Sequence, residues 1–262
     1  MKTKSNNTFY IVLIVILSVA VLGLIALLVV GITNKGFGFS SDNVSSNLVL
    51  ERDYSIEDLN RIDAKVKAGK VSVYSTQDEK AVVKFYSDKS SAAEVIASNN
   101  VLSIVDRNDD CHFICFNFKG VNVEVYIPNS YDGEIKLDVD AGAIMVEDFT
   151  AASLNIRDDM GDVTLGVAKN IDARLDMGRL TVVDCLGKIN IKNDMGDVEV
   201  KNLHLTENSE IKLDMGNVTI DNVGDARVDA DVDLGDKDVS GGNYKSDIVL
   251  TIQNSLGNIT VR

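Results

Sequence analysis

The chain has 262 residues, enough for one large or two small domains, and its 40 acidic and 26 basic residues give a formal net charge of −14. Every acidic residue lies after position 41, whereas Lys2, Lys4 and Lys35 lie before it. So acidic a chain repels phosphate backbones and anionic lipid, which argues against nucleic acid as a partner. Cations, cationic peptides or basic protein surfaces are better matched, and solubility alone is the other explanation of the charge.

Residues 9–31 form an uninterrupted apolar segment. Its 23 residues would span about 34 Å as a helix, against a hydrocarbon core of about 30 Å, so the segment predicts one transmembrane α-helix. Two lysines before it and one after it place residues 1–8 in the cytoplasm and the C-terminal domain outside the cell. We interpret the segment as an uncleaved, single-pass signal anchor in the cell membrane. The alternative is a cleaved signal peptide, whose apolar core is shorter, about 7–15 residues, and ends in small residues.

Residues 32–60 contain Gly36, Gly38 and a Ser/Asn-rich run, which is typical of a tether. Residues 61–262 are predicted to form one extracytoplasmic β-domain. Its first part holds five β-branched runs expected to be strands, at 62–67, 71–75, 81–86, 101–105 and 121–127.

A short phrase, most often Asp-Met-Gly, recurs throughout residues 137–262. Its glycines are 17 to 22 residues apart, and an earlier relative, Lys67-Ala68-Gly69, opens the domain. The repeated glycines are Gly142, Gly161, Gly178, Gly196, Gly216, Gly235 and Gly257. Self-similarity at a period near 20 is the mark of a solenoid.

Counted from each glycine, the apolar positions are −5, −1, +2 and +4, and position −3 is mixed. The period is two on each side, but the parity slips at the glycine, which one unbroken strand cannot accommodate. We therefore expect each glycine at a corner with φ > 0, joining two short strands whose apolar side chains point inward. Stacked copies would bury what one copy cannot, so the sequence predicts an all-β, parallel β-solenoid (β-helix-like) with rungs of about 19 residues. A β-sandwich of short strands is the alternative.

Three segments carry a family resemblance: Val-Glu-Val-Tyr-Ile-Pro at 123–128, Gly-Glu-Ile-Lys-Leu at 133–137, and the repeated Gly-x-Val-x-Val phrase. Over residues 60–262 the chain resembles the bacterial "putative adhesin" family of membrane-tethered β-strand-repeat proteins of unknown function. The resemblance implies a Gram-positive cell envelope, with some members encoded beside envelope-stress regulators. It supplies no catalytic residues.

An aspartate row is expected at position −2 of the repeats, on the outer side of the corner: Asp140, Asp159, Asp176, Asp194, Asp214 and Asp233. Such a row invites Ca²⁺, with Asp162, Asp197 and Asp236 as further ligands. Turn formation by Asp side chains is the preferred interpretation. The basic residues at position −4 would offset the repulsion without a metal: Arg157, Arg174, Lys192 and Lys212.

The methionines at position −1, Met160, Met177, Met195 and Met215, could bind a soft metal, but Leu and Ala in other copies favour a place in the core. Cys111, His112 and Cys115 contain potential zinc ligands without the usual repeated pair. For Cys111, Cys115 and Cys185 a local disulfide or buried thiols are favoured over a metal site.

No nucleophile motif is present, and only two histidines, His112 and His204, occur in the chain. We therefore predict no enzyme, and assign no catalytic, cofactor-binding or metal-ligating residue and no cofactor. The predicted function is a non-catalytic, membrane-anchored, adhesin-like interaction or scaffold module of the cell envelope. An accessory protein of envelope-stress sensing and a polysaccharide-active β-helix enzyme are the alternatives. A cleft lined by acids and aromatic residues would favour the enzyme.

The last copy, residues 256–262, ends in a strand with no capping sequence after it. The sequence therefore predicts an exposed edge at the C-terminus. Arg262 and the terminal carboxylate, or an upstream loop, could cover this edge. Another envelope protein or a second copy of the chain could instead add a strand to it.

Overall fold

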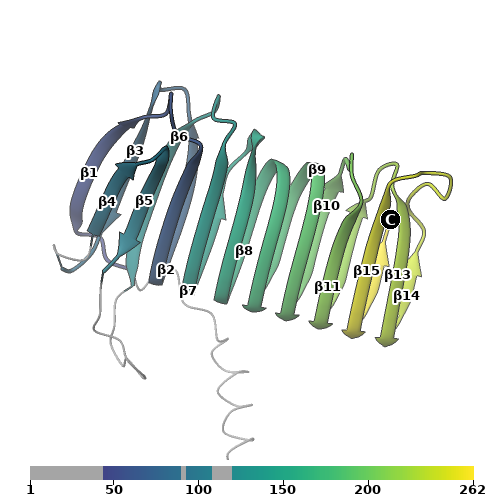
Figure 1. Ribbon diagram of the computed structural model, residues 1–262. Helices are drawn as coiled ribbons and strands as arrows, with labels where there is room; N and C mark the ends of the chain where they lie inside the picture. The colour runs from purple at the N-terminus through teal and green to yellow at the C-terminus, as the bar shows by residue number, and fades with distance from the viewer. Residues whose placement is uncertain (1–43, 90–92, 108–119) are drawn as a thin grey trace, which may run out of the picture. The chain divides into compact units, whose positions relative to one another are not determined.

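The structure, a computed structural model, describes residues 44–89, 93–107 and 120–262, and these residues are folded from β-strands and turns alone (Figure 1). The predicted transmembrane helix at 9–31 lies outside them, as do Cys111, His112 and Cys115. Within the described residues, no helix is long and apolar enough to cross a membrane.

Sixteen strands are present in the described residues. The N-terminal ones are β1 (Leu48–Ser55), β2 (Arg61–Thr76), β3 (Lys80–Tyr86), β4 (Ala93–Ser98), β5 (Val101–Asp106) and β6 (Val121–Pro128). The middle of the domain is formed by β7 (Glu134–Val146), β8 (Phe149–Met177), β9 (Leu180–Met195), β10 (Val198–Leu203), β11 (Ser209–Met215) and β12 (Val218–Asn222). The last ones are β13 (Arg227–Leu234), β14 (Lys237–Val239), β15 (Val249–Leu256) and β16 (Ile259–Val261).

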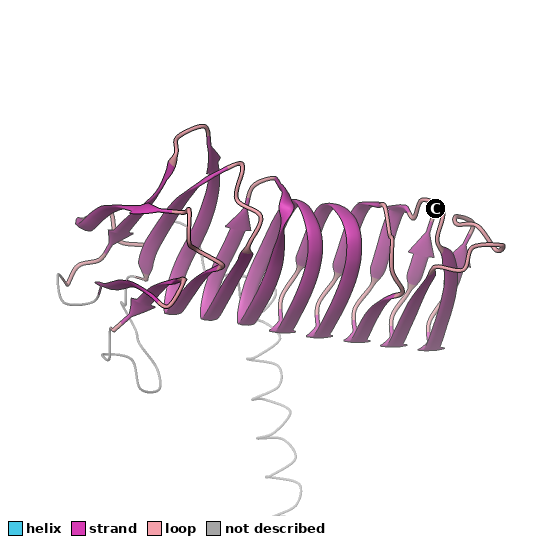
Figure 2. Ribbon diagram, turned by 45° about the horizontal axis from the view of Figure 1, so that its top comes forward, coloured by secondary structure: helices cyan, strands magenta, loops and turns pink. Residues whose placement is uncertain are grey.

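Each turn of the chain has a leading arm before the corner glycine and a trailing arm after it, and successive turns stack in parallel register (Figure 2). Gly142 pairs with Gly69 on one side and with Gly161 on the other, so equivalent positions of neighbouring turns lie side by side. The predicted parallel β-solenoid is confirmed. Strands β2, β7 and β8 bend through a corner without ending, at Gly69, Gly142 and Gly161, whereas from Gly178 onward the strands end at the corner.

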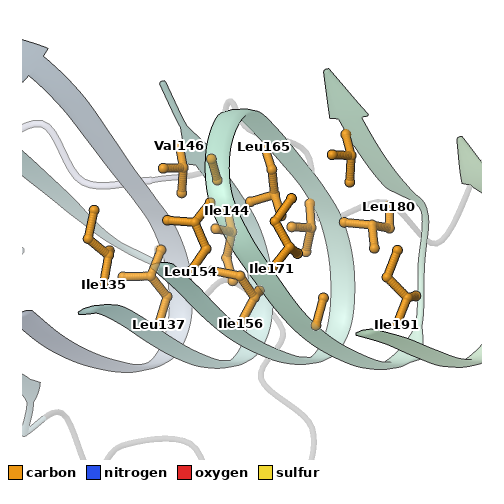
Figure 3. Packing of buried hydrophobic residues seen from close by; sticks show 14 of the residues in the cluster. Ile135, Leu137, Ile144, Val146, Leu154, Ile156, Leu165, Ile171, Leu180 and Ile191 are labelled. Carbon is orange, nitrogen blue, oxygen red and sulfur yellow. The ribbon is translucent and has the colours of Figure 1, made fainter. Parts of the chain in front are cut away.

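The core lies between the leading and trailing arms (Figure 3). At position −5, Leu137, Ile156 and Ile191 are buried, and at position +2 so are Ile144 and Leu180. Their side chains from successive turns contact one another along the solenoid axis, as Figure 3 shows for ten labelled residues. Since a single turn has no second layer to cover these side chains, it is stable only as part of the stack.

The five strand segments expected before residue 128 lie within β2, β3, β5 and β6, but the N-terminal end of the domain contains two strands that were not predicted. Strand β1 pairs antiparallel with β3, and β4 pairs antiparallel with β5. Strand β1 lies in the segment that the sequence analysis interpreted as tether. Its residues are mostly exposed or half-buried, so they lack the strong apolar alternation that would have indicated a strand.

The C-terminal end corrects the prediction of an exposed terminal strand. The last turn, β15 and β16, is inserted between the turn of β11 and β12 and the turn of β13 and β14. Strand β16 pairs with β12 through Thr219↔Thr260 and with β14 through Asp238↔Thr260. The edge of the described stack is therefore the penultimate repeat, and the C-terminal strand offers no free edge for a partner.

A charged residue at an inward position explains this order. Lys237 stands at position +2 of the penultimate repeat, where the other copies have Ile, Val or Leu. Burial between two turns would strip its ammonium group of water at a high cost in free energy. In the outermost turn Lys237 stays exposed, and its Nζ donates a hydrogen bond to the backbone oxygen of Ala230, 2.8 Å away. The last repeat, with Ile259 and Val261 at the inward positions, tolerates burial on both sides.

Candidate functional site: the glycine corner

The corner glycines lie so close together that no other residue fits. An ideal Cβ on Gly178 would overlap the carbonyl oxygen of Gly161, and one on Gly196 would overlap that of Gly178. Gly178 and Gly196 also have φ values of 147° and 131°, as the parity slip predicted. Gly161 has the same clash without a positive φ, so close approach of the backbones alone requires glycine there.

The methionines of position −1 are exposed, which corrects their predicted place in the core. The exposed fractions are 38% for Met160 and Met177, 43% for Met195 and 46% for Met215. Leu256 and Leu234, at 40% and 65%, continue the same row. In spatial order the row, here called the corner stripe, consists of Ala68, Ala141, Met160, Met177, Met195, Met215, Leu256 and Leu234.

Two neighbouring positions explain why the corner stripe points outward. The side chains at −3 and +2 fill the interior on either side of the bend, as Leu175 and Leu180 do in one turn. Residue −1 has an odd-numbered position and would point inward if the leading arm continued straight. The chain turns at the glycine, however, and the apolar side chain is left on the outer side of the corner. Periodicity alone could not reveal this, because the direction of a side chain at a bend is set by three-dimensional packing.

The aspartates of position −2 flank the corner stripe on the leading side, as predicted. Two of them pair with the basic residue at −4: Arg157 Nε lies 3.6 Å from Asp159 Oδ1, and Lys192 Nζ lies 2.9 Å from Asp194 Oδ1. The hydrogen bond from Lys192 to Asp194 raises the pKa of that lysine. Asp176 and Asp214 are exposed, and the described residues include no ion-pair partner for either.

The residues at position +1, on the trailing side, bond neighbouring turns together. Asp197 Oδ1 accepts hydrogen bonds from the backbone N–H of Asn217, at 2.9 Å, and from its Nδ2, at 3.0 Å. Asn217 Oδ1 accepts from the backbone N–H of Asn258, and Asn258 Oδ1 from that of Asp236. These bonds give Asp197 a structural role, that of linking neighbouring turns, which differs from the local turn formation expected for the aspartates of position −2. In the described parts of the chain, no three His, Cys, Asp or Glu side chains cluster as a metal site would require.

Position −3 holds a row of buried polar side chains among aliphatic ones. Asn193 Nδ2 donates to the carbonyl oxygen of Gly178 at 3.1 Å, and Asn254 Nδ2 donates to that of Gly216 at 2.9 Å. Asp158 occupies the equivalent place and is 1% exposed. Burial raises the pKa of its carboxyl to about 7. The negative charges of Asp159 and Asp162 add to this increase, whereas the backbone N–H of Met160 partly offsets it. From the sequence, position −3 is only mixed in character, and the burial of its polar side chains was not predicted.

Two further candidate residues of the described chain, Cys185 and His204, lie away from the corner. Cys185 is a free, buried thiol, and burial raises its pKa to about 11, which makes it unreactive. Of the two alternatives predicted for this residue, a disulfide or a buried thiol, the structure shows the buried thiol. His204 Nδ1 lies 3.0 Å from Asp184 Oδ1 at the surface. Because Asp184 is half-buried whereas Cys185 faces the core, the pair does not activate the neighbouring thiol.

A shallow depression of about 370 Å³ lies on the outer face of the leading arms. Its lining is charged and aliphatic and includes no aromatic side chain: Asp172, Ala173, Arg174, Asn190, Ile191, Lys192, Glu210 and Lys212. This is not the cleft of acids and aromatic residues that the polysaccharide-active alternative requires.

Stacked turns, in-register glycine corners and an unbroken apolar interior define a parallel β-solenoid repeat protein. The chain belongs to the Toastrack DUF4097 family, whose model matches residues 59–262. The resemblance to "putative adhesin" proteins noted in the sequence is thereby confirmed.

Solved structures similar to this chain have low sequence identity to it. A "putative adhesin" from Bacteroides fragilis is 18% identical, with 83% of this chain and 98% of that chain covered and a TM-score of 0.48. A "putative cell adhesion protein" from Clostridium sporogenes is 12% identical, with 81% and 98% covered and a TM-score of 0.42. No curated protein matches the chain significantly. The family assignment rests on the family model.

Proposed function

We propose that this protein is a non-catalytic, adhesin-like interaction module, held on the outer side of the cell membrane by residues 9–31 and presenting the corner stripe to a partner. One observation carries the proposal: large apolar side chains lie exposed in an unbroken row along six adjacent turns. Scattered exposed apolar residues are normal, but a contiguous row with polar flanks is typical of an interaction surface.

The alternative explanation, that the row serves stability, is not supported by its exposure. A methionine that contributed mainly to the core would be buried, as Leu175 and Leu213 at position −3 are. The side chains of the row include no carboxylate, imidazole, amine, hydroxyl or thiol, which suits a binding surface better than a catalytic site. Its regular spacing suits a scaffold that contacts an extended partner over several turns.

The outward location is proposed from the charge asymmetry around residues 9–31. External protease added to intact cells is expected to remove nearly the whole chain. Protection of the β-domain until the cells are lysed would contradict this orientation.

Photo-crosslinking in living cells tests the interaction surface. A photoreactive amino acid at Met195 is expected to crosslink to a partner, and the same amino acid at Thr181 serves as the matched control. Thr181 lies half-buried on the outer face of the trailing arm, away from the corner stripe. Equal crosslinking at the two positions, or crosslinking at Thr181 alone, would overturn the assignment of the corner stripe as the docking surface.

A further inference from the structure

We propose that the corner stripe binds a basic amphipathic α-helix of a partner protein, laid along the solenoid axis with about one apolar side chain on each turn. The inference rests on the proposed function and names the chemistry of the partner. It draws on three features of the stripe: its spacing, its methionines and its charged flanks.

The spacing of the turns matches a helix better than a strand. Neighbouring strands lie about 4.8 Å apart, and an α-helix advances about 5.4 Å per turn, so their mismatch is about 0.6 Å per step. Over the four methionine turns the accumulated offset stays at or below about half a step. An extended strand repeats its side-chain direction only every 6.8 Å or so and would lose register after one or two turns. A helix therefore meets Met160, Met177, Met195 and Met215 with successive apolar residues on one face.

Methionine suits this mismatch. Four of the six methionines of the chain lie in consecutive turns of the corner stripe, although Val, Ile and Leu fill the core. An unbranched, flexible thioether side chain adjusts its position by a fraction of an ångström at little cost, which a β-branched side chain does not. The stripe thus combines apolar character with the adaptability that docking of a helix requires.

The charges beside the stripe select a basic partner. On the leading side, aspartates occupy position −2 in five successive turns: Asp140, Asp159, Asp176, Asp194 and Asp214. Asp159 and Asp194 are paired with Arg157 and Lys192, so Asp176 and Asp214 are the carboxylates of this row that a basic partner would meet without an ion-pair partner in the described residues. On the trailing side, Asp162 and Asp197 alternate with Arg179, so that flank is acidic in balance as well. A helix with Lys or Arg beside its apolar face would bring those groups to both flanks, since long basic side chains reach outward from an apolar contact.

The same charges disfavour the other occupants. A second copy of this chain would set one acidic row against another, and an anionic lipid surface would be repelled. In the described residues no segment of the chain itself covers the stripe, because every Met and Leu in it is at least 38% exposed. A basic helix from another protein is the occupant that fits both the apolar row and its flanks.

The test uses the full chain in a neutral detergent and a fluorescently labelled, designed helix of Leu and Lys with a single apolar face. A peptide of the same composition in scrambled order is the control for charge alone. Fluorescence anisotropy is expected to show binding of the helix, weaker binding of the scrambled peptide, and loss of affinity with rising salt.

Two double variants separate the apolar contribution from the charge. Met177→Gln with Met195→Gln keeps two exposed side chains of similar length and is expected to weaken binding of the helix at least about tenfold. Asp176→Asn with Asp214→Asn, at aspartates outside the ion pairs, is expected to weaken binding by about threefold and to flatten its salt dependence. Thr181→Gln with Thr219→Gln, on the outer face of the trailing arms, is the matched control and is expected to bind as the parent does.

No binding of the designed helix to the parent chain, or equal binding by the Met177→Gln, Met195→Gln variant, would overturn the proposal. The photo-crosslinking experiment distinguishes this failure from failure of the proposed function. If Met195 crosslinks to a partner in cells while the designed helix does not bind, the corner stripe is a docking surface and the class of partner is wrong.

Discussion

Replacing Asp158 by asparagine is expected to stabilise the domain at neutral pH. Asp158 is the only acid among the buried polar residues of position −3. Neither of its carboxylate oxygens accepts a hydrogen bond of normal geometry in the described residues, although the backbone N–H of Met160 lies close enough to favour the charged form. Asparagine at the equivalent places donates to a glycine carbonyl of the neighbouring turn. By the repeat, the acceptor for residue 158 is the carbonyl oxygen of Gly142, which repels a carboxylate and accepts a bond from an amide or from a protonated acid.

The size of the effect follows from the pKa of this carboxyl. Burial raises its pKa from 3.8 to about 7, so the folded chain holds the proton more tightly than the unfolded chain does. The stabilisation that protonation gives is complete below about pH 4 and is lost as the pH rises through about 7. At 1.36 kcal/mol per pH unit the full loss is about 4 kcal/mol, an upper bound because Asp159, Asp162 and nearby water adjust.

Thermal melts between pH 4 and pH 8 measure this directly. The melting temperature of the parent chain is expected to fall over that range. The Asp158→Asn variant should lose the part of this pH dependence that comes from residue 158, and its melting temperature at pH 7.5 should be higher than the parent's by roughly 5–10 °C. The exposed aspartate Asp176, changed to asparagine, is the matched control and should leave the slope nearly unchanged. If Asp158→Asn melts below the parent at pH 7.5, or keeps its full pH dependence, the carboxyl is not buried against the corner as described.

Three further predictions concern the corner and the end of the stack. Gly161→Ala and Gly178→Ala should each destabilise the domain by about 3 kcal/mol or more, because a Cβ would overlap the carbonyl oxygen of the neighbouring corner; thermal melts matching the parent would contradict the close approach. Millimolar Ca²⁺ should leave the melting temperature almost unchanged, because Asp162 and Asp197 already accept backbone hydrogen bonds; a rise of several degrees that EDTA reverses would assign the acidic row to calcium. Thr260→Pro should lower the free energy of unfolding by about 3 kcal/mol or more, because β16 pairs with a strand on each side. Val239→Pro, on the outermost strand, should cost little, because the N–H that bonds to Val261 of β16 belongs to Ser240. Equal melting temperatures for the two variants would mean that the C-terminal strand lies at the edge after all.

The fold was predictable from the sequence because the repeat is regular. Apolar residues at −5, +2 and +4 recur in nearly every copy, and the parity slip at the glycine has one simple structural explanation, which the positive φ of Gly178 and Gly196 confirms. The sequence did not reveal that a glycine such as Gly161 is also required by the backbone of the next turn. That contact joins residues about 20 positions apart, and no local pattern encodes it.

The order of the last two turns and the exposure of the methionines were predicted wrongly for different reasons. Lys237 at an inward position was visible in the sequence and signalled that its copy could not be buried on both sides. The methionines gave no such signal, because Met, Leu and Ala are common in cores as well as at interaction surfaces. Only the bend at the glycine decides on which side of the corner position −1 lies.

Oxidation of the methionines in the folded chain tests the central claim, that the corner stripe is an exposed surface. Under mild peroxide the four thioethers of Met160, Met177, Met195 and Met215 should all form sulfoxides while the domain stays folded, as read by mass spectrometry beside circular dichroism. Met145, half-buried on the outer face of the trailing arm, is the internal reference and should react more slowly. If the four methionines resist oxidation until the domain unfolds, they belong to the core, and the docking surface described for this protein does not exist.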